Sequence, residues 1–124
     1  MQELQIIPAG EQTATFTSKE FEIAKGSRGA KFFLNISAVS GTTPTCIVKI
    51  QEKNPISGSW IDVQGALFAS KTGVGADTLE VYPGVVAVAN RRVSGVLSKT
   101  VRAAALIGGT TPSFNMSLAA VFLD

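Results

Sequence analysis

The sequence contains no histidine, and this absence removes the commonest forms of enzymatic acid–base chemistry. Without an imidazole there is no Ser-His-Asp or Cys-His arrangement and no histidine ligand for a metal. The one cysteine, Cys46, falls on the inward phase of an alternating segment, so we interpret it as a small buried hydrophobe. A single cysteine forms no intrachain disulfide, which suits a reducing compartment.

Charged residues are also scarce, at 16% of the 124 residues, against about a quarter in typical globular proteins. The net charge is only +2, and the basic residues are scattered, with Arg91-Arg92 as the one adjacent pair. A nucleic-acid-binding protein concentrates such residues into a stripe, so we expect no nucleic-acid partner. A charge-poor exterior instead leaves neutral area that can pack against another protein.

Long apolar runs are missing too. No stretch approaches the roughly 18 apolar residues that span a bilayer, so we expect no membrane association. The chain begins Met1-Gln2-Glu3-Leu4 without a basic region or an apolar run, so we expect no signal peptide and synthesis in a cytoplasm. The length suits one domain.

What the sequence does contain is apolar residues at alternate positions, the period of a half-buried strand. The inward sets are Phe32, Leu34, Ile36 and Ala38; Cys46, Val48 and Ile50; Val101, Ala103, Ala105 and Ile107; and Phe114, Met116, Leu118, Ala120 and Phe122. Weaker strands are predicted at 13–17, 21–24, 60–63, 78–82 and 85–89, with a short helical turn possible at 90–97. Frequent Gly and Pro between them predict an all-β, single-domain β-sandwich of about eight short antiparallel strands, either jelly-roll-like or immunoglobulin-like.

Local signals refine this outline. Residues 54–58 predict a hairpin loop, after which Trp60 begins the return strand as a core or hairpin-flanking aromatic. Residues 1–10 are interpreted as an N-terminal arm or an edge strand built on Leu4, Ile6 and Ile7, preceding a sandwich domain at 11–124.

One short motif occurs twice. Ser-Gly-Thr-Thr-Pro-Thr at 40–45 returns as Gly-Gly-Thr-Thr-Pro-Ser at 108–113, each between an apolar and an alternating segment. Proline fixes φ and gives a rigid turn exit, so both copies are predicted to close similar hairpins. The two tips either form a contact surface at one end of the sandwich or simply reuse a good turn sequence.

The acidic residues give no convincing site. Glu20 and Glu22 fall on one strand face, but a catalytic or calcium pair normally brings acids from different strands into a cleft. Gly73-Val74-Gly75 lacks the lysine and the helix of a phosphate-binding loop and is interpreted as a turn. We therefore predict a non-enzymatic protein without metal or cofactor.

Three stretches together resemble the small β-rich structural proteins of tailed bacteriophages. They are the run from Lys31 to Thr45, the segment from Val48 to Pro55 and the segment from Ser57 to Trp60. Tyr82-Pro83-Gly84-Val85 and the stretch from Gly109 to Phe114 fit the same pattern. The resemblance covers residues 30–123 and includes no catalytic motif. It implies a β-sandwich that packs in many copies in the virion.

On this basis we expect a virion protein, specifically a capsid decoration (cement) protein that binds the major capsid protein shell as a homo-oligomer, with a trimer favoured. The alternatives are a head–tail connector, tail-tube or minor tail subunit, and a carbohydrate- or host-surface-binding module using Trp60 or Tyr82. The predicted contact residues are Leu4, Ile6, Ile7, Thr42, Thr43, Pro44, Thr110, Thr111 and Pro112.

Overall fold

The computed structural model describes residues 2–123 and is all-β. Its strands are β1 (Gln2–Gln12), β2 (Phe16–Thr17), β3 (Phe21–Glu22), β4 (Gly29–Lys53), β5 (Trp60–Leu67), β6 (Gly75–Val81), β7 (Arg92–Val93) and β8 (Thr100–Leu123). They form a single hydrogen-bonded sheet of eight strands. The all-β, one-domain prediction is confirmed.

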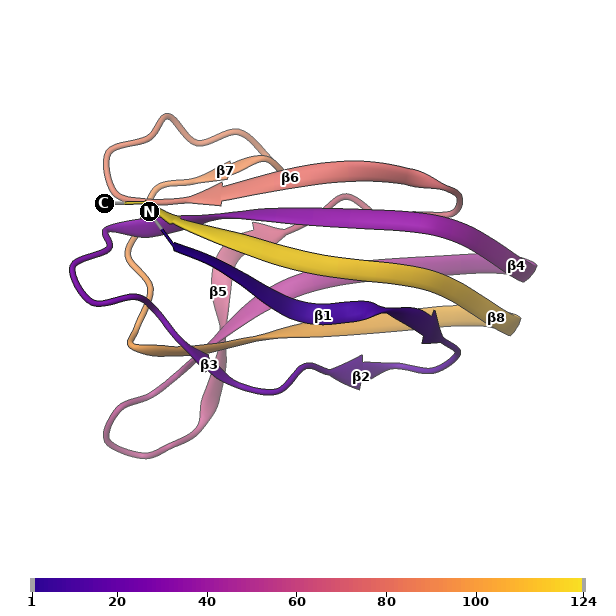
Figure 1. Ribbon diagram of the computed structural model, residues 1–124, viewed down its shortest axis with the longest axis horizontal. Coiled ribbons are helices and arrows are strands. Elements are labelled where there is room, and N and C mark those ends of the chain that lie inside the picture. The colour runs from indigo at the N-terminus through magenta and orange to yellow at the C-terminus, as the bar shows by residue number, and fades with distance from the viewer. Residues whose placement is uncertain (1, 124) are drawn as a thin grey trace.

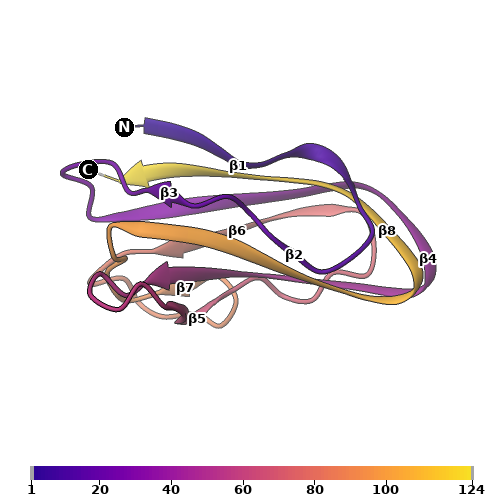
Figure 2. The same cartoon turned by 90° about the horizontal axis from the view of Figure 1, so that it is seen from below.

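Two long strands organise this sheet. β4 and β8 pair antiparallel from Gly29 opposite Leu123 to Glu52 opposite Val101, so strands expected to be short are 25 and 24 residues long. Both bend near their midpoints, and the sheet folds over into two facing layers (Figures 1 and 2). We call them the β1 layer, with strand order β1-β8-β4-β6-β7, and the β5 layer, in which the other halves of β8 and β4 pair with β2, β3 and β5.

The core between the layers is formed by the alternating residues that the sequence indicated. Phe32, Val48 and Phe114, one from each of three segments, are fully buried, and no polar or charged residue among those described is buried. Ala38 is an exception, because a register shift after Ile36 turns it outward, where it is exposed.

The hairpin predicted at 54–58 is confirmed, with Lys53 opposite Trp60. The Asn54 carboxamide oxygen accepts hydrogen bonds from the amides of Ile56 (2.9 Å) and Ser57 (3.1 Å), an Asx turn that closes the loop.

Residues 2–10 form part of an edge strand, which was one of the two predicted alternatives. β1 pairs with β8 from Gln2 opposite Phe122 to Gln12 opposite Phe114, while Met1 and Asp124 lie outside the described residues. Register shifts after Gln5 and Ile7 interrupt the alternation, and Ile6 and Ile7 are both buried with 2% of their surface exposed.

Two local predictions were wrong. Residues 85–89 form no strand, although Val88 makes an isolated bridge to Arg92, and residues 90–97 contain the two-residue strand β7 and no helical turn. β7 lies parallel to β6, with Glu80 opposite Arg92, and takes the position beside β6 at the sheet edge.

Candidate functional site: the folded end

The two Gly-Thr-Thr-Pro motifs meet where β4 and β8 bend. Each lies in the middle of its long strand, and Thr42 is opposite Thr110. The prediction of separate hairpin tips was therefore wrong, whereas their placement together at one end of the sandwich is observed (Figure 2). We call residues 40–45 and 108–113 the folded end.

The motifs are reciprocal partners. Gly41 and Gly109 share a φ of +111°, and Thr43 and Thr111 share a φ of +46°. A Cβ on Gly41 would lie 2.7 Å from the Thr111 carbonyl oxygen, and one on Gly109 would lie 2.7 Å from the Thr43 carbonyl oxygen. Each glycine thus leaves room for the other strand's threonine carbonyl, which is the physical reason that the motif occurs twice.

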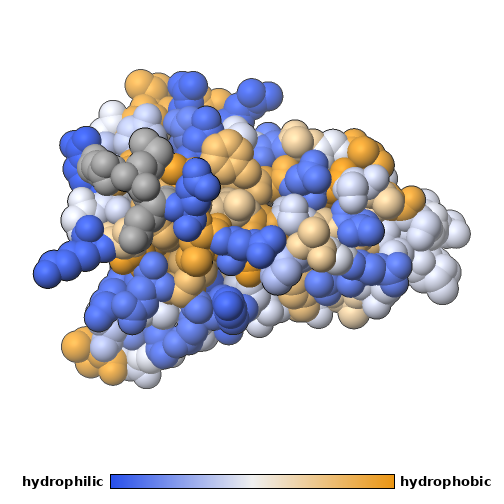
Figure 3. All heavy atoms as spheres, in the orientation of Figure 1, coloured by the Kyte–Doolittle hydropathy of each residue, from blue (hydrophilic) through white to orange (hydrophobic). Residues whose placement is uncertain are grey.

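The surface of the folded end is neutral and rich in hydroxyl groups. Thr42, Thr43, Thr110 and Thr111 are exposed, and the two prolines are half-buried. The Thr43 and Thr111 hydroxyls each donate to the preceding threonine's carbonyl oxygen at 2.8 Å, which fixes their orientation. None of the twelve residues is charged, and this end is pale in Figure 3.

The remaining predicted contact residues lie elsewhere. Leu4 is half-buried in β1 and packs against the hydrophobic core. Ile6 and Ile7 belong to the hydrophobic core, so neither side chain is available to a partner in the folded chain. The register shifts that bury both were not evident from the sequence.

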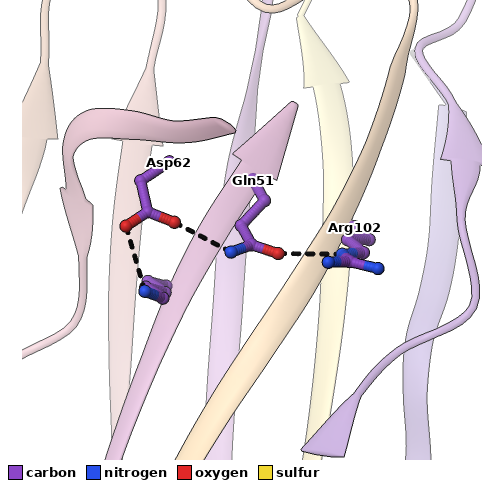
Figure 4. Close-up of polar contacts among 4 residues, drawn as sticks. Gln51, Asp62 and Arg102 are labelled. Carbon is purple, nitrogen blue, oxygen red and sulfur yellow. Dashed lines mark hydrogen bonds and ion pairs between the residues drawn. The ribbon is translucent and has the colours of Figure 1, made fainter. Parts of the chain in front are cut away.

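A polar network on the β5 layer was missed by the sequence analysis. Figure 4 shows Gln51 between Asp62 and Arg102: its amide nitrogen donates to Asp62 (2.8 Å) and its oxygen accepts from Arg102 Nε (2.8 Å). Lys49 Nζ contacts Asp62 at 3.0 Å. Hydrogen bonds from Gln51 and Lys49 hold the pKa of Asp62 below its usual value. The sequence did offer one indication of this network. Lys49 and Gln51 alternate with inward residues and so face outward, on the strand that pairs with the predicted return strand.

Trp60 is part of this network and does not present an open ring. The Arg102 guanidinium lies 4.3 Å from the Trp60 ring centroid, and Lys53 Nζ lies 5.8 Å from it. Trp60 and Tyr82 are both half-buried. The hairpin-flanking interpretation of Trp60 matches this environment.

The cysteine and the two neighbouring glutamates considered in the sequence analysis do not form a common site. Cys46 is fully buried, and burial raises the pKa of its thiol to about 11. Glu20 pairs with Lys53 at 3.8 Å, while Glu22 is exposed on β3. Within residues 2–123, no three acidic or cysteine side chains gather as a metal site.

Besides the hydroxyl-rich folded end, the protein exposes several large apolar side chains. The most exposed are Ile56, Val86, Val74 and Val96, with 93%, 77%, 69% and 68% of their surfaces accessible. All four lie in connections between strands.

Comparison with known proteins adds no identification. No family model matches the chain, and no curated protein matches it. Across the described residues, no helix has the length and apolar character needed to cross a membrane.

Proposed function

We propose that this protein is a non-enzymatic structural subunit of a tailed-bacteriophage virion, a decoration (cement) protein that binds the major capsid protein shell. The observation that supports a contact role is the folded end, an uncharged surface made of two reciprocal motifs. The resemblance of residues 30–123 to phage structural proteins supplies the virion context.

The folded end has properties suited to repeated, modest contacts. Its backbone is constrained by paired strands, by two prolines and by the close approach of Gly41 to Thr111, so little conformational entropy is lost on binding. A standard interface removes about 800 Å² per partner. That is roughly an eighth of this chain's 6700 Å² of accessible surface, so one copy has room for a shell and for neighbouring copies.

A co-sedimentation experiment tests the proposal. The purified full chain is mixed with expanded heads of the phage that encodes it, lacking their own copy, and bound protein is measured in the pelleted heads. We expect saturable binding in a fixed ratio to the major capsid protein. Thr42→Arg with Thr110→Arg should weaken it at least tenfold, because two charges enter an uncharged contact.

The matched control is Thr13→Arg, which places the same side chain at another exposed threonine outside the folded end. Equal binding by the double variant and the control would remove the folded end from the contact. No binding to heads, with binding to isolated tails instead, would replace the decoration function by the connector or tail alternative.

A further inference from the structure

Residues 85–89 combine strand-forming composition with a non-strand structure. The five residues are Val, Val, Ala, Val and Ala, a sequence with high β propensity. Val86 and Val88 are 77% and 40% exposed. In the part of the chain that the structure describes, the amides at 85, 86 and 87 donate no hydrogen bond. An apolar segment with free amides can add to the edge of another sheet when it becomes extended there.

This segment lies beyond β6, at one edge of the β1 layer, and is followed by Asn90, whose Nδ2 donates a hydrogen bond to the Leu67 carbonyl oxygen of β5 at 3.2 Å. It belongs to the connection from β6 to β7, which loops outside β7 in Figure 1. The opposite edge of the same layer is β1, whose strand neighbour among the described residues is β8. Each copy of the chain therefore has free amides at residues 85–87 on one side of the layer, next to the Val88–Arg92 bridge, and an open strand edge on the other.

The two edges carry opposite charge. β1 contains Glu3 and Glu11, both exposed, and no basic residue. The connection ends in Arg91 and Arg92, also exposed; Arg92 Nε pairs with the Glu80 carboxylate of β6 at 3.7 Å, so the two arginines outnumber the one acidic residue opposite them. Opposite charges on the two surfaces favour their meeting and disfavour contact between two like edges.

We infer that residues 85–89 of one copy dock against the β1 edge of a second copy of this chain. The contact is heterologous, because it joins different surfaces of the two copies, so repeated docking closes a ring when the rotation permits. A ring of three is the trimer expected from the sequence. The inference deepens the proposed function by naming the contact between copies, but the contact itself needs no capsid.

Light scattering coupled to size exclusion, on the full chain over a range of concentrations, tests the contact. The loop variant is Val86→Asp, and its matched control is Val74→Asp at an exposed valine before β6. The edge variant is Glu3→Lys with Glu11→Lys, and its control is Glu22→Lys on β3. We expect the wild type and both controls to form one discrete oligomer and each contact variant to be a monomer.

Mixing the two contact variants tests whether the contact is heterologous. The loop variant keeps an intact β1 edge and the edge variant keeps an intact segment, so an equimolar mixture should form dimers that grow no further. Failure of the mixture to associate, or a Val86→Asp variant that assembles like Val74→Asp, would overturn the inference. A wild-type monomer that still binds heads would also overturn it, while leaving the proposed function standing.

Discussion

Gly41 lies so close to Thr111 that a Cβ added to it would be 2.7 Å from the Thr111 carbonyl oxygen. Gly109 has the same relationship to Thr43. The approach of the two backbones at the bend of β4 and β8 therefore depends on two glycines, each with a φ that other residues rarely adopt.

Replacing either glycine should destabilise the fold. We expect Gly41→Ala and Gly109→Ala each to lower the free energy of unfolding by about 2 to 4 kcal/mol, from backbone strain and the clash with a carbonyl oxygen. Urea unfolding measures the change. Gly73→Ala is the control, because nothing lies within 4 Å of its Cβ position and its φ is not positive. Equal effects at all three positions would contradict the close approach.

Replacing Arg102 should expose the Trp60 ring. Arg102→Lys keeps the charge but loses the planar group 4.3 Å from the ring centroid and the Nε bond to Gln51. We expect the free energy of unfolding to fall by about 1 kcal/mol. We also expect a red shift of tryptophan emission, which reports on one site because the chain has one tryptophan. The control is Arg91→Lys at an exposed arginine. An unchanged spectrum for Arg102→Lys would rule out the stacking.

Burial of Cys46 should make stability fall in alkaline solution. Its pKa rises from 9.0 to about 11 in the folded chain. The unfolded chain therefore releases the thiol proton first. The stability contribution is intact below pH 9 and is lost as pH rises toward 11, by about 2 to 3 kcal/mol. Urea unfolding of wild type and Cys46→Ala from about pH 8 to about pH 11 isolates the contribution of the Cys46 thiol, since all other groups titrate equally in the two proteins. Parallel pH curves for the two proteins would refute it.

Asp77 should contribute to stability against acid. Burial opposes ionisation, but hydrogen bonds from Lys71 and the Thr78 amide, together with the charges of Lys71 and Arg91, lower the pKa of Asp77 below 3.8. The stability from this lowered pKa is present above about pH 4 and is lost as pH falls through the folded-state pKa.

Asp77→Asn should therefore reduce stability at neutral pH by up to about 1 kcal/mol and flatten the loss on acidification, measured by urea unfolding across the acid range. Glu22→Gln is the control, because Glu22 is exposed on β3. If Asp77→Asn keeps the wild-type acid dependence, the Lys71 contact at 3.0 Å is not stabilising in solution.

The sequence by itself determined the fold class and most of the core. Residues such as Phe32, Val48 and Phe114 alternate with polar neighbours, and because side chains on a strand point to opposite faces, this pattern fixes which residues are buried. It also fixed the hairpin at 54–58, where Asn54 closes the loop through its own side chain.

Only the tertiary structure decided where the two Gly-Thr-Thr-Pro motifs lie. A glycine at positive φ followed by a proline suits both a hairpin turn and a bend within a long strand, so the local sequence does not distinguish them. The partner strand decides between them, and here each motif faces the other. At residues 85–89 the local sequence favours a strand but none forms. The position beside β6 is taken by Arg92 and Val93, so the segment has no partner strand there.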